Sequence, residues 1–332
     1  MCTAMSWVRN DSFYFGRNMD IERSFGEQVV ITPRGYPLTF KREAAQTVKY
    51  AMIGMGSVAQ DYPLYAEAVN ERGLGVAGTY FPGFAKYATE EKEGHFNVAA
   101  YELIPWILSR YATVDEAYDD LTRLNLMALS LMDGLPVAEL HWLVSDRKRS
   151  VVIEFTEAGL QLTEDPIGLL TNNPSAAWHL MNLRTYLGVT AEQPEETSWD
   201  GLPLTALGQG QGAYGLPGDA SPPSRFVKAA FLKAHAAGAE TEAERVSQFF
   251  HILDGVAMVR GTVALPNGGM DSTTYSSCMS IDEGLFYYKT YGNSRITAVD
   301  LNGEDLDGEK LIVYPLNQQQ DILRQPQPRG KG

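Results

Sequence analysis

Residues 1–20 read MCTAMSWVRNDSFYFGRNMD and place a cysteine directly behind the initiator methionine. The segments CTAMSWV and SFYFGRN have the composition of two short β-strands, and the polar residues RND between them favour a tight turn. Antiparallel pairing of these strands would bring residues near position 2 alongside residues 17–20. We therefore expect Cys2, Arg17 and Asp20 to lie close together at one end of a hairpin.

Removal of Met1 would give Cys2 both a thiol and a free α-amino group. The pKa of such a thiol is about 8.5 and that of the amine about 7.7 to 8.0. A local positive charge could therefore leave a substantial thiolate fraction beside an amine that carries protons. Arg17 could supply that charge, and Asp20 could anchor and orient the amine. Position alone also allows a plainer interpretation, in which Cys2 is a buried apolar residue and Arg17 and Asp20 form an ordinary ion pair.

Composition narrows the class of protein. The chain has 332 residues, 44% of them hydrophobic, which is enough for a packed core. Its formal net charge of -14 disfavours nucleic acid and anionic membrane surfaces as partners, and no Lys/Arg cluster reverses this locally. The N-terminus has no signal-peptide core and no run approaches a membrane span, so we expect a cytoplasmic protein.

Metal and disulfide chemistry have little support in the sequence. Two cysteines, Cys2 and Cys278, allow at most one disulfide, and Cys278 is expected to be a buried structural thiol. The five histidines are scattered and form neither an HExxH motif nor a paired zinc-ligand spacing. We expect His141 and His179, which lie among apolar residues, to be packed and hydrogen-bonded rather than catalytic. No metal and no organic cofactor are predicted.

The order of predicted elements indicates an α+β protein. Strand-like segments fill the first part, two helices are predicted between Asn97 and Asn125, and strands follow in LHWLVSD, SVVIEFTEAG, LQLTED and GLLTNNP. The second of those helices begins at Thr113, with Glu116 in a capping-box position. Two more helices are predicted in RFVKAAFLKAHAA and TEAERVSQFFHIL, followed by strands around a Gly-Asn turn. This order favours helices that cover stacked antiparallel sheets.

Several long segments resemble one enzyme family. They are MCTAMSW, FYFGRNMDIERSFGEQVVITPR, NERGLGVAGTYFPG, PVAELHWLVSD, LLTNNP, PLTALGQGQGAYGLPGDASPPSRFVKAAFL, VAMVRG and TYSSCM. In this order they resemble the choloylglycine hydrolase family, the N-terminal-nucleophile amidases that include bile salt hydrolases and penicillin V acylases. The resemblance spans nearly the whole chain. It implies a four-layer αββα sandwich of two antiparallel sheets covered by helices, in one domain over residues 1–332.

The resemblance also implies roles for individual residues. Cys2 matches the nucleophile, which here would need only the removal of Met1, and Arg17 and Asp20 match the residues that flank the thiol. Asn172 in LTNNP matches the side chain of the oxyanion hole, completed by a backbone N–H from the region of Tyr80. The family's further arginine near the nucleophile is matched by Arg225 in PSRFVK.

The implied reaction is hydrolysis of a linear, non-peptide amide through a thioester on Cys2. A tyrosine at position 80 is frequent in penicillin V acylases, whereas asparagine is frequent there in bile salt hydrolases, so Tyr80 slightly favours penicillin V as the substrate. Conjugated bile salts are a near-equal alternative, dual activity is a further one, and a non-catalytic binding relative is a remote one. Family members are commonly homotetramers. We expect residues 187–224, rich in Gly, Pro and Gln, to be an assembly segment, and residues 317–332 to be a polar tail that frays.

Overall fold

The N-terminal hairpin that the sequence predicts is present in the computed structural model. Strand β1 (Cys2–Arg9) pairs antiparallel with β2 (Ser12–Ile21), and Cys2 lies opposite Met19. The two turn residues, Asn10 and Asp11, have φ angles of 48° and 61°, as a type I′ turn requires. This turn sets the register that brings the beginning of β1 and the end of β2 together.

The hairpin forms the middle of the first of two antiparallel sheets. In the described part of the chain this sheet has seven strands in the order β14-β1-β2-β18-β19-β20, with β17 paired to β18. The added strands are β14 (Leu169–Leu170), β17 (Val263–Ala264), β18 (Met270–Ser280), β19 (Leu285–Thr290) and β20 (Asn293–Asp300). Gly16 makes the close contact between β2 and β18 possible, because a Cβ there would lie 2.0 Å from the carbonyl oxygen of Ser277.

The second sheet runs in the order β13-β12-β11-β8-β7-β6-β3-β21. Its strands are β3 (Gln28–Thr32), β6 (Met52–Ala59), β7 (Tyr62–Asn70), β8 (Gly75–Tyr80), β11 (Leu140–Ser145), β12 (Ser150–Thr156), β13 (Gly159–Glu164) and β21 (Ile312–Pro315). Buried apolar side chains of both sheets meet between them, among them Phe15 from β2 and Ile53 from β6. The two sheets therefore stack face to face.

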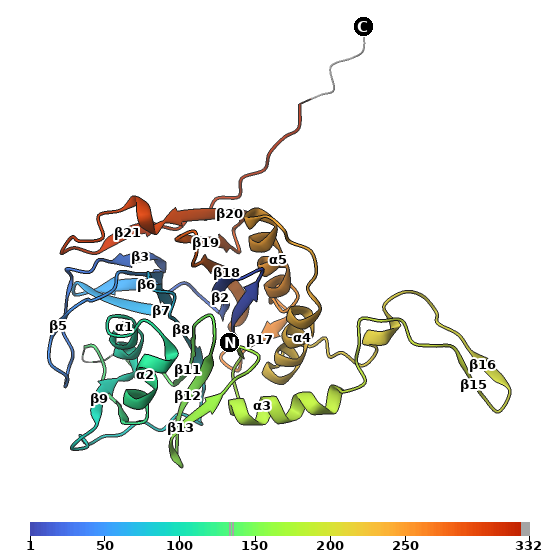
Figure 1. The fold of residues 1–332 in the computed structure, drawn as a ribbon, viewed down its shortest axis with the longest axis horizontal. Coiled ribbons are helices and arrows are strands. Elements are labelled where there is room, and N and C mark those ends of the chain that lie inside the picture. Colours follow the sequence, from blue (N-terminus) through green and yellow to red (C-terminus); the bar gives the residue numbers. More distant parts are fainter. Residues whose placement is uncertain (133, 135, 327–332) are drawn as a thin grey trace, which may run out of the picture.

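Helices cover the outer face of each sheet (Figure 1). The outer faces pack against α1 (Leu103–Leu108) and α2 (Val114–Leu121) on the second sheet, and against α4 (Pro222–His235) and α5 (Glu242–Asp254) on the first. Thr113 caps α2 as predicted, while the Glu116 carboxylate accepts from the N–H of Ala112 rather than that of Thr113. The layer order is α, β, β, α, and the predicted α+β sandwich is confirmed.

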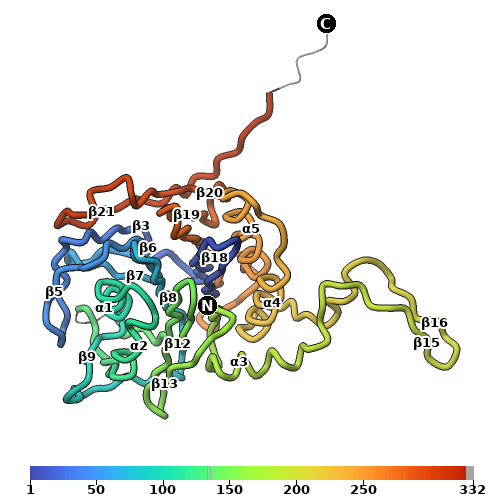
Figure 2. Tube along the Cα trace, viewed as in Figure 1, coloured from blue at the N-terminus to red at the C-terminus, as the bar shows by residue number. Residues whose placement is uncertain are grey.

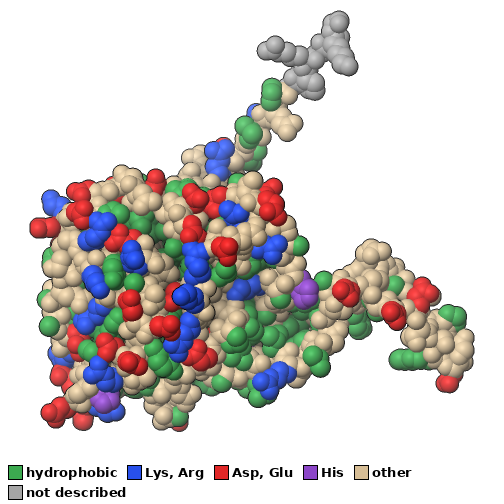
Figure 3. Space-filling model, viewed as in Figure 1, with side chains coloured by type: hydrophobic (Ala, Val, Ile, Leu, Met, Phe, Trp, Pro, Cys, Tyr) green, Lys and Arg blue, Asp and Glu red, His purple; other side chains and the backbone are tan. Residues whose placement is uncertain are grey.

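The remaining elements are short. They comprise β4 (Pro37–Leu38), β5 (Gln46–Thr47), β9 (Phe96–Ala99), β10 (Leu124–Met127), β15 (Thr197–Trp199), β16 (Leu202–Leu204), α3 (Ala176–Leu183) and the 3₁₀ turns Ala100–Glu102, Arg184–Tyr186, Gln211–Ala213 and Leu301–Gly303. The β15–β16 hairpin stands at the tip of an arm that projects away from the sandwich (Figure 2). Hydrophobic side chains lie on its surface (Figure 3), where Trp199 and Leu202 are mostly exposed.

The structure describes residues 1–132, 134 and 136–326. Residues 317–326 of the predicted tail lie mainly on the surface without a helix or strand, and the rest of that tail is outside the described residues. Among the helices of the described residues, none has the length and apolar character needed to cross a membrane.

Candidate active site

Cys2 lies at the beginning of β1, and its side chain is buried with the apolar residues between the two sheets. Its Sγ is 3.8 Å from Sδ of Met19, the residue opposite it on β2. Its backbone nitrogen, which is still in peptide linkage to Met1, donates to Oδ1 of Asn172 at 2.9 Å. The thiol is therefore enclosed, and the nitrogen that would become the α-amino group already has a defined acceptor.

Arg17 is fully buried on β2 behind the thiol. Its Nη1 donates to the carbonyl oxygens of Gly78 at 2.6 Å and Ala66 at 3.1 Å, and its Nη2 lies 3.6 Å from the same Met19 sulfur that touches Cys2. Burial alone would lower the pKa of Arg17, but surrounding negative charges, with Cys2 foremost among them, raise it above its usual value. The guanidinium thus remains a fixed positive charge next to the thiol.

Asp20 also lies at this end of β2 and contacts Met1 through its backbone. Its N–H donates to the Met1 carbonyl oxygen at 2.9 Å, and its own carbonyl accepts from the Met1 ammonium group. Oδ1 of Asp20 accepts from Thr273 at 2.6 Å, whereas Oδ2 is buried with no hydrogen-bond partner among the described residues. Burial raises the pKa of Asp20, and Arg225 opposes that shift.

Asn172 connects Cys2 to the second sheet. Besides the bond from the Cys2 nitrogen, its Oδ1 accepts from Nη2 of Arg225 at 2.7 Å, and its Nδ2 donates to the carbonyl oxygen of Tyr80 at 2.7 Å. Because an amide nitrogen carries two protons, one N–H of Asn172 stays available for another acceptor. The predicted oxyanion role would therefore use this second N–H, because the first one binds the carbonyl at the end of β8.

The backbone of Tyr80 also faces this site. The N–H of Phe81 donates to the carbonyl oxygen of Glu139, just before β11. Tyr80 itself lies opposite Leu140, so the backbone hydrogen bonds between β8 and β11 are made by residues 79 and 81. In an antiparallel ladder the N–H and C=O of the residue between them point to the other side. The N–H of Tyr80 therefore points to the same side as its carbonyl, which binds Asn172. Its side chain is 46% exposed.

Arg225 extends from the first turn of α4 and is buried against β1. Its Nη1 donates to the Cys2 carbonyl oxygen and to Thr3 Oγ1, and lies 3.9 Å from Oδ2 of Asp20. Burial lowers the pKa of Arg225, while Asp20 and Cys2 oppose the decrease. The structure thus brings together all six residues predicted from the sequence.

Sequence reasoning missed a carboxylate behind Arg17. Glu67 on β7 accepts from Tyr275 and Ser277, both at 2.8 Å, and its Oε2 lies 3.7 Å from Nη1 of Arg17. Burial raises the pKa of Glu67 to about 7, and Arg17 opposes the increase. Only the packing of β7 against the other sheet brings these residues together, so the sequence contains no local signal for them.

His179 and His141 are packed and hydrogen-bonded, as predicted, but they hold the segment that carries Asn172. Nε2 of His179 is 2.9 Å from the Asn172 carbonyl oxygen, and Nδ1 of His141 is 2.9 Å from Oε1 of Glu154. The same Glu154 oxygen accepts from the N–H of Ala176. Burial lowers the pKa of His179 to about 4, so the ring is neutral at pH 7 and its Nε2 can donate to the carbonyl.

A cavity of about 270 Å³ opens beside these residues, and we call it the apolar cavity. Its lining is mostly apolar and includes Ala66, whose carbonyl binds Arg17, and Leu140, which lies opposite Tyr80 in the β8–β11 pair. An apolar group could therefore occupy it, and the six predicted site residues lie outside its lining.

Known proteins match this chain closely. The profile of a family described as linear amide C-N hydrolases, choloylglycine hydrolase family, matches residues 2–314. The bile salt hydrolase/transferase of Lactiplantibacillus plantarum is 42% identical over 316 residues, which cover 95% of this chain and 97% of that protein. That of Clostridium perfringens is 40% identical over 320 residues, covering 96% and 97%.

Solved structures agree with these matches. A mutant conjugated bile acid hydrolase from Clostridium perfringens superimposes with a TM-score of 0.92 at 39% identity, covering 98% of this chain and 99% of that one. A penicillin V acylase from Agrobacterium tumefaciens superimposes with a TM-score of 0.75 at 18% identity, covering 96% and 92%. At that identity the second match supports the fold alone.

Proposed function

Because this chain belongs to the choloylglycine hydrolase family of linear amide C–N hydrolases, we propose that it cleaves the amide bond of conjugated bile salts. The observation that carries this proposal is the near full-length identity of 42% and 40% to bile salt hydrolases. The family match also favours catalysis over the non-catalytic alternative.

The penicillin V preference that Tyr80 slightly favoured has weaker support. The acylase that matches is only 18% identical, whereas the relatives with substantial identity are named for bile salts or bile acids. Tyr80 is 46% exposed and does not line the apolar cavity, so its ring does not fill that cavity. The alternative substrate class is therefore our main proposal.

In the proposed reaction, removal of Met1 frees the α-amino group of Cys2. The Cys2 thiolate attacks the amide carbonyl, a C–S bond forms, and the electron pair of the C=O bond moves onto its oxygen. One N–H of Asn172 and the backbone N–H of Tyr80 stabilise this oxyanion. When the intermediate collapses, the α-amino group delivers a proton to the leaving nitrogen, and the amino acid departs.

Water then attacks the thioester, with the Cys2 α-amino group as the base, and releases the bile acid while the thiol is restored. Arg17 and Arg225 favour the thiolate, because both are buried positive charges whose pKa responds to Cys2. Asp20 is proposed to hold the free amine, since its buried Oδ2 has no other hydrogen-bond partner among the described residues. The apolar cavity beside Arg17 would receive the steroid.

Purified protein should be assayed side by side with glycocholate, taurocholate and penicillin V. We expect kcat/KM for at least one bile salt to exceed that for penicillin V by more than about tenfold, and a preference for penicillin V would reject the proposal. A Tyr80→Asn variant tests the pocket residue, and we expect it to change the ratio between substrates less than threefold.

We also propose that the chain forms a homotetramer in the cytoplasm and that residues 187–224 take part in its assembly. The exposed apolar side chains of the arm, including Trp199 and Leu202, support this proposal. Light scattering on the whole chain and on a Trp199→Ser/Leu202→Ser variant tests it. The variant should have a lower mass, and a wild-type monomer would contradict the proposal.

A further inference from the structure

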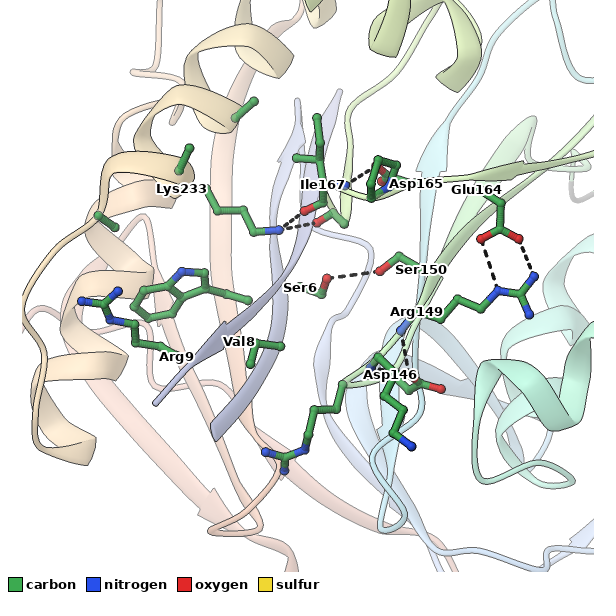
Figure 4. A pocket seen from close by; sticks show the side chains of 18 residues that line it. Ser6, Val8, Arg9, Asp146, Arg149, Ser150, Glu164, Asp165, Ile167 and Lys233 are labelled. Carbon is green, nitrogen blue, oxygen red and sulfur yellow. Dashed lines mark hydrogen bonds and ion pairs between the residues drawn. The ribbon is translucent and has the colours of Figure 1, made fainter. Parts of the chain in front are cut away.

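A second and larger cavity lies at the other end of β1. It has a volume of about 780 Å³ and is formed by the end of β1, the β11–β12 turn, the segment after β13 and the last turns of α4 (Figure 4). Cys2 is at the first position of β1, whereas Ser6 to Arg9 contribute to this cavity. We call it the basic cavity, and none of the six predicted site residues lines it.

The charge of this cavity is opposite to that of the chain, so the expectation that no Lys/Arg cluster locally reverses the net negative charge is wrong here. Among its lining residues are five cations and three carboxylates, in a protein whose net charge is -14. The carboxylates already have partners: Glu164 binds Arg149, Asp165 accepts from backbone N–H groups of its own loop, and Asp146 accepts from the N–H of Val114. All three carboxylates therefore already have ion-pair or hydrogen-bond partners in the walls of the cavity.

Two of the cations are also paired, Arg149 with Glu164 and Arg147 with Asp282. The other three are Arg9, Lys148 and Lys233, which form no ion pair with a carboxylate of the described residues; Arg9 instead donates from Nε and Nη2 to the carbonyl oxygen of Gly238 at 3.3 and 3.2 Å. Cations that line one concave site without carboxylate partners attract an anion more strongly than isolated surface cations do.

A bound anion would stabilise the charged ammonium group of Lys233. Its ammonium group reaches from α4 across the cavity and donates to the carbonyl oxygens of Ile167 and Gly168, as Figure 4 shows. Burial lowers the pKa of Lys233 to about 8, and Asp165 opposes the decrease only in part. A bound anion would favour the charged form of this amine, so anion binding and protonation of Lys233 support each other.

The rest of the lining is apolar. Trp7, Val8, Ile167 and Ala230 line the same cavity, and Val8 is 47% exposed. A bare inorganic anion would leave this surface in contact with water, whereas a ligand with an apolar body would cover it.

We propose that the basic cavity is a binding site for an organic anion, a carboxylate or sulfonate attached to an apolar body. The cations that line the cavity attract the anionic group, and the apolar body lies on Trp7 and Val8. The site is separate from the nucleophile, so binding can be measured without turnover.

Hydrogen exchange followed by mass spectrometry locates the binding on the whole chain. Cholate, decanoate and inorganic phosphate serve as probes, since cholate and decanoate share an apolar body with a carboxylate but differ in shape. We expect cholate or decanoate to slow exchange in peptides covering residues 146–150 and 164–168. Protection by cholate alone identifies a steroid-shaped ligand, and protection by decanoate alone a flexible chain.

Two variants with equal changes in net charge complete the test. Arg9→Glu/Lys148→Glu reverses two cavity cations, whereas Lys92→Glu/Lys310→Glu reverses two exposed lysines elsewhere. The cavity variant should bind the organic anion at least tenfold more weakly, and the control variant within about threefold of wild type.

Lys233 is left unchanged because it also holds its neighbouring loop. The proposal is overturned if neither organic anion protects these peptides, if both variants weaken binding equally, or if phosphate protects as well as cholate and decanoate do. If the chain fails to hydrolyse bile salts, that result rejects the proposed function and leaves this binding test intact.

Discussion

Replacing Asn172 with aspartate separates the two tasks of this side chain. Aspartate has the same size and can still accept from the Cys2 nitrogen and from Arg225, which are 2.9 and 2.7 Å from Oδ1. It loses both amide protons, one of which binds the Tyr80 carbonyl while the other is proposed to bind the oxyanion.

The two losses have different sizes and different readouts. Loss of an oxyanion donor raises the barrier by roughly 2.7 to 4 kcal/mol, or about 10² to 10³ in kcat, and the added negative charge would increase this further. Aspartate leaves the Tyr80 carbonyl without its donor, which costs about 1 to 3 kcal/mol of stability and lowers Tm by several degrees in a chain of this length. We therefore expect kcat to fall at least about 100-fold in a protein that is still folded.

The assay is the rate of glycine release from saturating glycocholate, with circular dichroism to follow folding. Asn173→Asp is the matched control, because Nδ2 of Asn173 donates to the Pro82 carbonyl at 2.8 Å but has no contact with Cys2. A kcat for Asn172→Asp within about threefold of wild type, or an equal loss in the control, would refute the assigned role.

Three further predictions concern residues around this donor. Cys2→Ser should reduce the rate of hydrolysis more than about 10³-fold with an unchanged fold. Cys278→Ser, at a fully buried position away from the site, should keep the wild-type rate. The intact mass of the active wild-type protein should show that Met1 is gone. His179→Leu leaves the Asn172 carbonyl without its donor and should lower kcat about tenfold with little change in KM, and His179→Gln should restore part of it; equal rates for the two variants would contradict this positioning role. The pKa of Glu67 is raised from 4.5 to about 7, so the stability that the protonated Glu67 contributes is present below pH 4.5 and lost as the pH rises through 7. The Tm of Glu67→Gln minus that of wild type should therefore increase between pH 5 and pH 8. A constant difference would refute the assigned titration.

Local sequence patterns were sufficient for the hairpin and for most helices. The Asn10–Asp11 turn, the Thr113 cap and the turn between β19 and β20 each depend on a few consecutive residues whose preferences agree with the final fold. Because the register of a hairpin follows from its turn, Cys2 could be placed near Arg17 and Asp20 without knowledge of the rest of the chain.

The longer-range part of the site depended on resemblance instead. Asn172 and Arg225 are more than 150 residues from Cys2, and locally they look like a turn asparagine and a first-turn helix residue. Nothing in the sequence near Glu67 or His179 indicates that either contacts a proposed catalytic residue, because their partners come from other elements. Burial of a charge or an imidazole ring is a property of the assembled sandwich, so its pKa shift could not be predicted from the sequence.

Tyr80 explains why substrate preference was the weakest prediction. The contact that Tyr80 makes in this site is a backbone contact: its carbonyl binds Asn172, and its N–H faces the same side. Any residue except proline can provide these two groups at position 80, whereas Tyr80 is 46% exposed and its side chain does not line the apolar cavity. The identity of residue 80 is therefore separable from catalysis and only loosely tied to the acyl pocket. If the apolar cavity receives the acyl group as proposed, side chains that line it, such as Ala66 and Leu140, should affect the choice of substrate more strongly. An Ala66→Leu variant should accordingly reduce kcat/KM for glycocholate more than Tyr80→Asn does, and the opposite order would return Tyr80 to the centre of specificity.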